Sequence, residues 1–310
     1  MNVRACIKML RPTQWTKNGF LLLPILFGNA FAHWTVSQIL LFSGSAFAAF
    51  CCWSSTVYIL NDILDRKTDA LHPRKKNRPI ASGKVSVPAA LCIAIFLAFF
   101  PFVLFLLPVS VWPFAVPEML RWVPLAGLCY LVNSILYCLF FKHQVLLDVF
   151  SIALGFVIRV TAGCLALDLR PSNWILLCTF SLALYLGFGK RQMEIACLKE
   201  RPGEFRPVLE LYSREYLNFL LGISGAVCLI SYLFYTLSPA TYQLHHTDGL
   251  IFTVPFVFYG IFKYAQDAML GTFDGPDEVL FRDRAFFINA VLWGACSTLI
   301  LYGRMVLGLF

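Results

Sequence analysis

Charged residues are scarce in this chain. They account for 14% of its 310 residues, whereas hydrophobic residues account for 59% and phenylalanine alone occupies 30 positions. A soluble globular domain has about a quarter of its residues charged. The composition therefore excludes an ordinary water-soluble fold and predicts an all-α integral membrane protein.

The sequence also lacks the paired motifs of a thiol-ligated metal site. Its 11 cysteines form no C-x-x-C pair and no paired cysteine–histidine motif, so we interpret them as small apolar packing residues. No stretch rich in glycine, serine or charge divides the chain either. We therefore expect one transmembrane domain over residues 1–310.

Long apolar runs are abundant. Several reach the roughly 20 residues that a helix needs to cross about 30 Å of hydrocarbon. We count nine such runs and predict a bundle of nine transmembrane helices. The expected spans are residues 18–34, 37–60, 86–107, 119–140, 145–168, 172–189, 216–238, 249–266 and 286–308.

Lysine and arginine concentrate in alternate loops between these runs. Because basic residues near helix ends stay cytoplasmic during insertion, we predict a multi-pass protein of the inner (cell) membrane with a cytoplasmic N-terminus. Two long polar loops, at about residues 61–85 and 190–215, and Lys142 between the fourth and fifth spans then lie on the cytoplasmic side. The net charge of +8 suits anionic headgroups and phosphorylated substrates, and no soluble basic module indicates nucleic acid.

Three aspartates follow the second apolar run at helical spacing. Asp62, Asp65 and Asp69 occupy positions i, i+3 and i+7, which a continuing helix would align on one face beside Asn61. Magnesium prefers carboxylate oxygens together with phosphate oxygens and water. A solvated acidic turn is the alternative, but three acids at a helix C-terminus oppose the helix dipole. We therefore predict that the three carboxylates converge on Mg²⁺ and are catalytic.

A dense positive segment comes next. It contains His72, Lys76 and Arg78, and Pro79 follows the arginine. A metal-bridged diphosphate needs negative and positive protein groups side by side. An ordinary cytoplasmic loop accounts for part of these charges, whereas the neighbouring proline is expected to hold Arg78 in place. We predict substrate contacts from all three side chains.

Arg159 lies near the middle of the fifth span, where an ionised side chain is costly and usually faces a watery cavity or a partner. Asp148 lies eleven residues earlier, almost three whole turns, so both residues share one side of the helix. A structural ion pair is the alternative, but a separation of roughly 16 Å along the axis makes their direct contact improbable. We favour a phosphate-binding role for Arg159.

The segment from Arg11 to Asn18 combines basic, amide and aromatic groups where the chain enters the membrane. Trp15 is typical of an interfacial anchor. Lys17 and Asn18 are either snorkelling residues or ligands for a sugar phosphate, and the sequence leaves both interpretations open.

The two long polar loops each follow the second helix of a block of four predicted helices, which hints at an internal duplication. If the halves are duplicated, Lys190 and Arg191 occupy the position at which the first half carries its aspartates. The two loops would then face each other across one cytoplasm-facing polar cavity, with an acidic pole opposite a basic pole.

The nine predicted helices and the N-D-x-x-D pattern at Asn61 to Asp65 resemble the UbiA superfamily of membrane prenyltransferases. The resemblance implies a UbiA-type bundle of nine transmembrane helices. Members normally carry a second aspartate-rich motif after helix six and use both motifs to hold two magnesium ions on a prenyl diphosphate. In this chain residues 190–194 read Lys-Arg-Gln-Met-Glu instead. A prenyl diphosphate donor would be poorly served by one acidic motif.

A narrower resemblance accounts for this departure, because the chain is similar throughout to the polyprenyl-phosphate phosphoribosyltransferases. Its markers include residues 11–18, 61–73, 78–83, 148–163, 189–191 and 276–284. The resemblance implies Mg²⁺-dependent transfer of 5-phosphoribosyl from phosphoribosyl diphosphate (PRPP) to a polyprenyl phosphate of the decaprenyl type, with release of diphosphate. It also suggests a precursor for the cell envelope. We expect substrate contacts from Lys17, Asn18, Asn61, His72, Lys76, Arg78, Lys142, Asp148, Arg159, Lys190 and Arg191.

Two other functions compete with this one. A UbiA-type aromatic prenyltransferase would use the same first motif on a prenyl diphosphate, but it would be expected to carry the second acidic motif. A transporter or flippase of lipid phosphates fits nine helices and a buried Arg159, but it gives no reason for three aligned aspartates. The prenyl chain length, the oligomeric state and the pathway fed by the product are left open by the sequence.

Overall fold

The computed structural model describes residues 3–71, 75–106, 116–197, 207–273 and 275–306. Every regular element in these ranges is a helix, as the composition predicts. The chain divides into two units, Met1–Leu139 with Ile158–Pro171, and Phe140–Val157 with Ser172–Phe310. One boundary lies at the end of the fourth predicted span, and another passes through α7 (Leu147–Ala166) between Val157 and Ile158, so the predicted blocks of four helices stay a prediction. The single domain over residues 1–310 stays a prediction.

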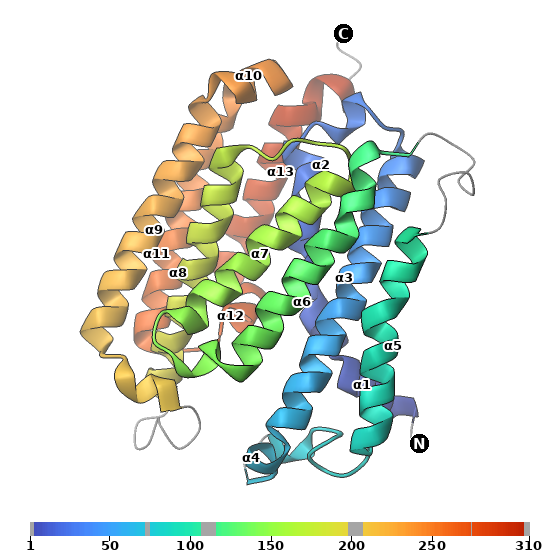
Figure 1. Ribbon diagram of the computed structural model, residues 1–310. Coiled ribbons are helices and arrows are strands. Elements are labelled where there is room, and N and C mark those ends of the chain that lie inside the picture. Colours follow the sequence, from blue (N-terminus) through green and yellow to red (C-terminus); the bar gives the residue numbers. More distant parts are fainter. Residues whose placement is uncertain (1–2, 72–74, 107–115, 198–206, 274, 307–310) are drawn as a thin grey trace. The chain divides into compact units, whose positions relative to one another are not determined.

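The first unit is organised around the long helix α3 (Val36–Leu64), which lies beside α5 and α6 in Figure 1. Thr35 starts this helix with a capping box, in which Thr35 and Gln38 each bind the other's backbone N–H. Trp53 is fully buried and packs its ring against Phe50 and Phe102. The remaining elements are α1 (Val3–Leu10), η1 (Pro12–Leu22), α2 (Leu23–Phe27), η2 (Ala30–Ala32), α4 (Arg66–Leu71), η3 (Lys75–Asn77), α5 (Val87–Leu106), η5 (Glu118–Trp122), α6 (Val123–Leu139) and the second part of α7 (Leu147–Ala166).

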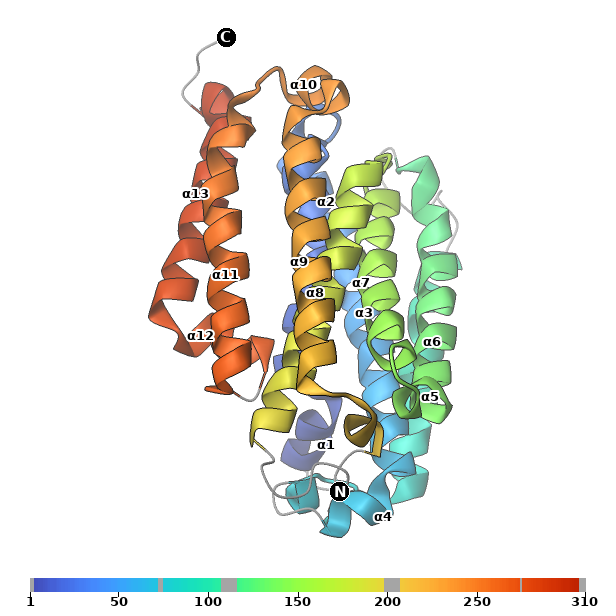
Figure 2. The ribbon, with the colours of Figure 1, turned by 90° about the vertical axis from the view of Figure 1, so that its left-hand side faces the viewer.

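The second unit is built on α8 (Asn173–Cys197) and α9 (Arg214–Leu237), which pack along their length, and on α11 (Val254–Leu270). Figure 2 shows α11 beside α13 (Arg284–Val306), with α12 (Pro276–Arg282) joining them. Tyr185 and Tyr264 are buried between α8 and α11 and donate hydrogen bonds to backbone carbonyls across the contact. The remaining elements are the first part of α7, η6 (Phe141–His143), η8 (Pro207–Leu211), α10 (Pro239–His245) and η9 (Gly249–Thr253).

Six helical stretches of the described residues are long and apolar enough to cross a membrane. They are Val36–Leu64, Val87–Phe105, Glu118–Leu139, Leu147–Ala166, Arg214–Leu237 and Arg284–Gly303. Large apolar side chains such as Phe96 and Phe99 stand exposed on α5, which suits a hydrocarbon surrounding. The protein is therefore an integral membrane protein. The other three predicted spans coincide with η1 and α2, with α8 and with α11, so the count of nine and the polar cavity stay predictions.

Candidate active site

The aspartate motif lies where α3 ends. The helix stops at Leu64, Asp65 forms a turn, and α4 begins at Arg66, so the predicted continuous helix is interrupted. The N–H groups of Asp65 and Asp69 still donate to the carbonyls of Asn61 and Asp65, at 2.9 and 2.8 Å. Helical hydrogen bonding across the turn keeps Asp62 and Asp69 on one side of the chain, as their spacing predicts.

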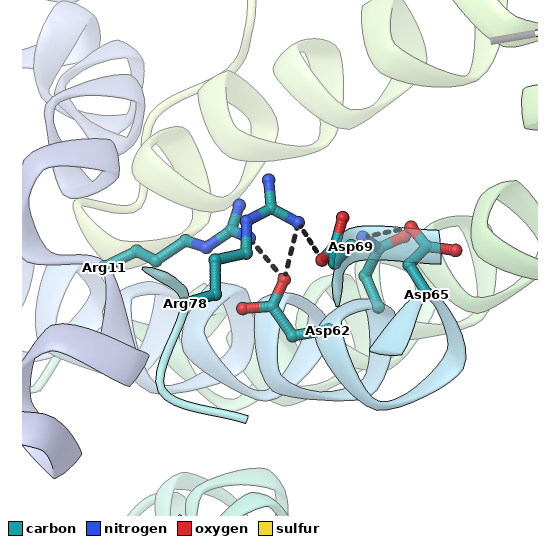
Figure 3. Close-up of polar contacts among 6 residues, drawn as sticks. Arg11, Asp62, Asp65, Asp69 and Arg78 are labelled. Carbon is teal, nitrogen blue, oxygen red and sulfur yellow. Dashed lines mark hydrogen bonds and ion pairs between the residues drawn. The ribbon is translucent and has the colours of Figure 1, made fainter. Parts of the chain in front are cut away.

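Two arginines meet these carboxylates (Figure 3). Arg78 Nη1 donates to Asp62 Oδ1 at 3.1 Å and to Asp69 Oδ2 at 2.5 Å, and Arg11 Nη2 pairs with the same Asp62 oxygen. Asp62 and Asp69 are only 1% and 3% exposed. Because buried carboxylates are costly unless paired, the guanidinium groups offset the desolvation of both aspartates.

Arg11 lies between α1 and η1, 51 positions before Asp62 in the sequence. Its backbone adopts the left-handed region, with φ 53° and ψ 60°, which an arginine seldom occupies. Ser55 fixes the segment from both sides, because its hydroxyl donates to the Leu10 carbonyl at 3.0 Å and accepts from Trp15 Nε1 at 3.1 Å. The Arg11 guanidinium also lies over the ring of Tyr58, 5.1 Å from its centroid. The strained turn is therefore held where it aims Arg11 at Asp62.

The predicted convergence of three carboxylates is not found. Asp65 Oδ2 accepts a hydrogen bond from Asn61 Nδ2 at 2.9 Å, on the side of the turn away from the Asp62 carboxylate in Figure 3. Across the described ranges no group of three or more His, Cys, Asp or Glu side chains is placed to hold a metal ion. The break at Asp65 separates it from the other two aspartates. Lys76 is exposed in η3, and His72 lies outside the described residues.

The Asp62 and Asp69 side chains nevertheless suit a magnesium ion. A single nitrogen, Arg78 Nη1, reaches an oxygen of each carboxylate, so one cation can contact both aspartates at once. Magnesium is commonly held by one or two carboxylates together with phosphate oxygens and water. The donor set therefore fits Mg²⁺ bound with a phosphorylated ligand better than Mg²⁺ bound by protein alone.

A second polar cluster surrounds Arg159 on α7, in the part that belongs to the first unit. Arg159 Nε donates to Asn18 Oδ1 at 2.8 Å, and Nη2 donates to the hydroxyl of Tyr130 at 3.0 Å. The guanidinium carbon lies 4.6 Å from the centroid of the Tyr130 ring. Asn18 is fully buried and donates to Ser54 Oγ and Cys51 Sγ on α3. These contacts orient the Arg159 guanidinium.

Close backbone packing makes this arrangement possible. A Cβ atom at Gly163, one turn after Arg159, would lie 1.9 Å from the carbonyl oxygen of Leu21 on η1. Only glycine allows α7 and η1 to approach so closely. Lys17 on the same element donates to Gln14 Oε1 at 2.6 Å and is only partly buried. Asn18 is thus in direct contact with Arg159, whereas a role of Lys17 in substrate binding stays a prediction.

In the second unit, Asp148 and Arg191 form a buried ion pair. Arg191 Nε donates to Asp148 Oδ2 at 2.8 Å and Nη1 to Glu194 Oε2 at 2.5 Å, and the two paired residues are 0% and 1% exposed. The hydroxyl of Tyr212 donates to Asp148 Oδ1 at 2.8 Å and accepts from the N–H of Leu146 at 2.7 Å. These contacts favour a structural role for Asp148 and Arg191 over the predicted contact with substrate, which stays a prediction.

Tyr212 completes this network. Burial raises the pKa of its phenol above the ordinary value, so the hydroxyl keeps the proton that it donates to Asp148. The same hydroxyl accepts a hydrogen bond from the N–H of Leu146, whose backbone is also in the left-handed region with φ 69°. Lys142 in η6 and Lys190 on α8 lie on the segments that this network joins, and both are partly buried. Substrate binding by Lys142 and Lys190 therefore stays a prediction.

We expect Tyr212→Phe to lower the melting temperature of the purified protein. The change removes a hydroxyl with two buried partners, and a buried polar group left unsatisfied costs about 1–3 kcal/mol. Thermal unfolding in detergent measures the effect. Tyr216→Phe is the matched control, because Tyr216 stacks on Tyr212 but is 37% exposed. Equal melting temperatures for the two variants would contradict the assignment.

A further ion-pair network in the second unit joins α11 to the start of α13. Lys263 Nζ lies 2.6 Å from Asp267 Oδ1 and 2.8 Å from Asp283 Oδ2. The hydrogen bond from Lys263 holds the pKa of Asp283 below its usual range. Asp283 also accepts from the N–H of Phe286 at 2.8 Å, so it anchors the first turn of α13.

Sequence reasoning did not identify Arg11, Tyr130 and Tyr212 as site residues. Arg11 carried a signal, since it opens the segment that was singled out, but its partner lies 51 positions away. Tyr212 lies in the polar loop at residues 190–215 but was given no role, and Tyr130 carried no signal, because it is one of 12 tyrosines in an aromatic-rich chain.

Comparison with known proteins agrees with the fold. The UbiA prenyltransferase family model matches residues 21–193. The decaprenyl-phosphate phosphoribosyltransferase of Corynebacterium glutamicum is 31% identical over 301 residues, which cover 96% of this chain and 86% of the relative. The enzyme of the same name from Mycolicibacterium smegmatis is 30% identical over 299 residues, covering 94% of this chain and 90% of the relative.

Solved structures share the fold at lower identity. A UbiA homolog from Archaeoglobus fulgidus bound to DMAPP and Mg²⁺ superposes with a TM-score of 0.68 at 18% identity, over 95% of this chain and 98% of the other. The same homolog bound to GPP and Mg²⁺ gives a TM-score of 0.67 at 19% identity, over 96% and 99%. With the family model matching more than half of its length, this chain belongs to the UbiA prenyltransferase family.

Proposed function

We propose that this protein transfers the 5-phosphoribosyl group of PRPP to a polyprenyl phosphate of the decaprenyl type and releases diphosphate. The observation that carries the proposal is the cluster of Asp62 and Asp69 with Arg11 and Arg78 at the end of α3. The chain that carries this cluster matches, over most of its length, relatives that are named for this reaction. We place the reaction at the cytoplasmic face of the inner membrane, on the side where the basic loops lie.

The charges of the substrates agree with the charges of the first unit. The donor carries a 5-phosphate and a diphosphate, and the acceptor carries a third phosphate. Arg11 and Arg78 at one cluster and Arg159 at the other supply fork-shaped donors that suit phosphate oxygens. Ser54, which touches the Asn18 side chain, lies about 12 Å along α3 from Asp62 by the helical rise of about 1.5 Å per residue. Two phosphate sites at such a spacing suit a donor with charge at both ends, or a donor and an acceptor phosphate side by side.

In the mechanism, Asp62 and Asp69 would hold Mg²⁺ together with the donor diphosphate, whereas the predicted contribution of Asp65 would need its side chain to turn away from Asn61. Bound there, the ion supplies neutralisation of the charge that develops on the leaving diphosphate. Arg11 and Arg78 bind the same group and add to that stabilisation. Arg159, fixed by Asn18 and Tyr130, holds a phosphate of the donor or the acceptor.

The bond changes need no general base. The bond from the anomeric carbon to the diphosphate oxygen breaks, the electron pair leaves with diphosphate, and the sugar becomes oxocarbenium-like. An oxygen of the acceptor phosphate, which is already anionic, forms the new bond to that carbon. The chain's contribution is therefore mainly to bring the two anionic substrates together and orient them.

The direct test is an assay on membranes that contain the protein. Radiolabelled PRPP, Mg²⁺ and decaprenyl phosphate are expected to give a labelled lipid, and chelation of the metal is expected to stop its formation. A parallel reaction offers a prenyl diphosphate and an aromatic acid, because the solved family members are bound to prenyl diphosphates. Prenylation of the acid without a labelled lipid would replace the proposal by an aromatic prenyltransferase. No reaction in either assay would favour a lipid-phosphate transporter.

A further inference from the structure

The cluster at the end of α3 is electrically balanced. Two aspartates contribute two negative charges, and Arg11 and Arg78 contribute two positive ones, all within direct contact. The carboxylates are almost fully buried, whereas the arginine side chains are 23% and 25% exposed. A balanced cluster with buried acids resists any change that leaves a net charge inside it.

The arginines also contact the carboxylate oxygens that a metal ion would need. Arg78 Nη1 lies between Asp62 Oδ1 and Asp69 Oδ2, the position from which one cation contacts both. Arg11 approaches the same Asp62 oxygen from the other side, as Figure 3 shows. A divalent cation entering alone would therefore compete with two guanidinium groups and would raise the local charge by two.

A diphosphate changes this balance. Its oxygens are strong acceptors for the guanidinium groups that a metal would displace from the aspartates. The partly exposed arginine side chains can turn toward solvent, where such a ligand arrives, while the buried aspartates stay in place. Metal and diphosphate entering together add opposite charges, so the cluster stays near neutrality.

We infer that Arg11 and Arg78 exchange partners when the donor binds, an inference that rests on the proposed function. They leave Asp62 and Asp69 to the metal and take the diphosphate oxygens. Each ligand removes the obstacle to the other, so metal and diphosphate bind cooperatively and each binds weakly alone. Couplings of this kind are about 5- to 150-fold in affinity and act equally in both directions.

Equilibrium binding to the purified full-length protein in detergent tests the exchange. Labelled inorganic diphosphate is expected to bind wild type at least about 10-fold more tightly with saturating Mg²⁺ than with a chelator. Titration with Mn²⁺ alone, followed by its spin-resonance signal, measures the metal site without diphosphate. Arg78→Met is expected to bind Mn²⁺ about 10-fold more tightly than wild type and to bind diphosphate with Mg²⁺ more weakly. These opposite signs are the signature of exchange.

Three variants separate exchange from a general effect of charge. Arg11→Met acts from another element and is expected to shift both affinities in the same directions as Arg78→Met, which guards against misfolding of either variant. Arg78→Lys keeps the competing charge and is expected to keep Mn²⁺ binding weak. Lys84→Met removes an exposed charge six residues from Arg78 and is expected to change Mn²⁺ affinity less than about twofold, because solvent screens it.

Unchanged Mn²⁺ affinity in Arg78→Met and Arg11→Met, or an equal gain in Lys84→Met, would overturn the exchange. Formation of labelled lipid alongside that result would leave the proposed reaction standing. The opposite signs without labelled lipid would retain the exchange and assign the diphosphate to another donor.

Discussion

Asp62→Asn is expected to lower the rate of phosphoribosyl transfer by about 100- to 1,000-fold, the cost of losing one well-placed electrostatic contact to a transition state. Asp62 contributes the oxygen that both arginines share, and we place the same carboxylate on the metal. Asparagine keeps the size and shape of the side chain but removes its charge. Initial rates with labelled PRPP and decaprenyl phosphate in membranes measure the effect.

The loss is expected to be one of function and not of folding. Arg11 and Arg78 are about a quarter exposed, so water can solvate them when Asp62 loses its charge. Membrane yield is therefore expected to stay close to wild type, whereas the melting temperature is expected to fall, because asparagine leaves one excess positive charge in the balanced cluster. Asp248→Asn, the same change before η9 at a residue that makes no side-chain cap, is the matched control and should retain full activity. Full activity of Asp62→Asn would remove Asp62 from the binding of metal and diphosphate.

The membrane helices follow from the sequence because their signal is local. The predicted spans over α3, α5, α6, α7, α9 and α13 were recognisable as apolar runs of sufficient length. The first predicted span was wrong in form, because it is a 3-10 helix followed by the short helix α2. Pro24 stands in the first turn of α2 and cannot donate its backbone nitrogen to a continuing helix.

The end of α8 shows where local reasoning fails. The sequence placed residues 190–194 in a loop because they are polar, yet α8 continues to Cys197 and Arg191 is fully buried. The charge of Arg191 is matched by Asp148, which lies 43 positions earlier on another helix. A charged residue lowers the local hydropathy and so argues against a membrane helix. In the folded protein its charge can be neutralised by a partner that is too distant in the sequence to enter the local average.

The aspartate cluster was predictable only in part, because local spacing places two of its residues and distant contacts place the others. The i, i+7 spacing placed Asp62 and Asp69 on one side, and both meet Arg78. Arg11 depends on a left-handed turn held by Ser55, and such a turn leaves no periodic signal. The turn at Asp65, which interrupts the predicted helix, likewise leaves no periodic signal.

Each unit carries an ion pair between an arginine and an aspartate, but the two pairs differ in exposure. In the first unit Arg11, which follows α1, pairs with Asp62 near the end of α3. In the second unit Asp148, in the first turn of α7, pairs with Arg191 near the end of α8. The first pair has a partly exposed arginine, which the proposed exchange requires, whereas the second is closed to solvent.

Arg159→Met is expected to reduce kcat/KM by about 100- to 1,000-fold, because the change removes a charge-assisted contact to phosphate. Arg159 is 5% exposed within a membrane helix, where its charge is costly, so an apolar residue of similar length relieves that cost. The loss of its bond to Asn18 acts in the opposite direction, by about 1–3 kcal/mol. The melting temperature should therefore change little.

Steady-state rates for Arg159→Lys separate charge from geometry. Lysine keeps the positive charge but cannot contact Asn18, Tyr130 and a phosphate with one rigid fork, so an intermediate rate is expected. Arg121→Met removes an exposed arginine that lies over the ring of Trp122, and it is expected to leave kcat/KM unchanged. Wild-type rates in Arg159→Met would show that the buried guanidinium binds no phosphate in the reaction. The second phosphate would then have to be bound by lysines outside the apolar spans, among which Lys17 lies on the same element as Asn18.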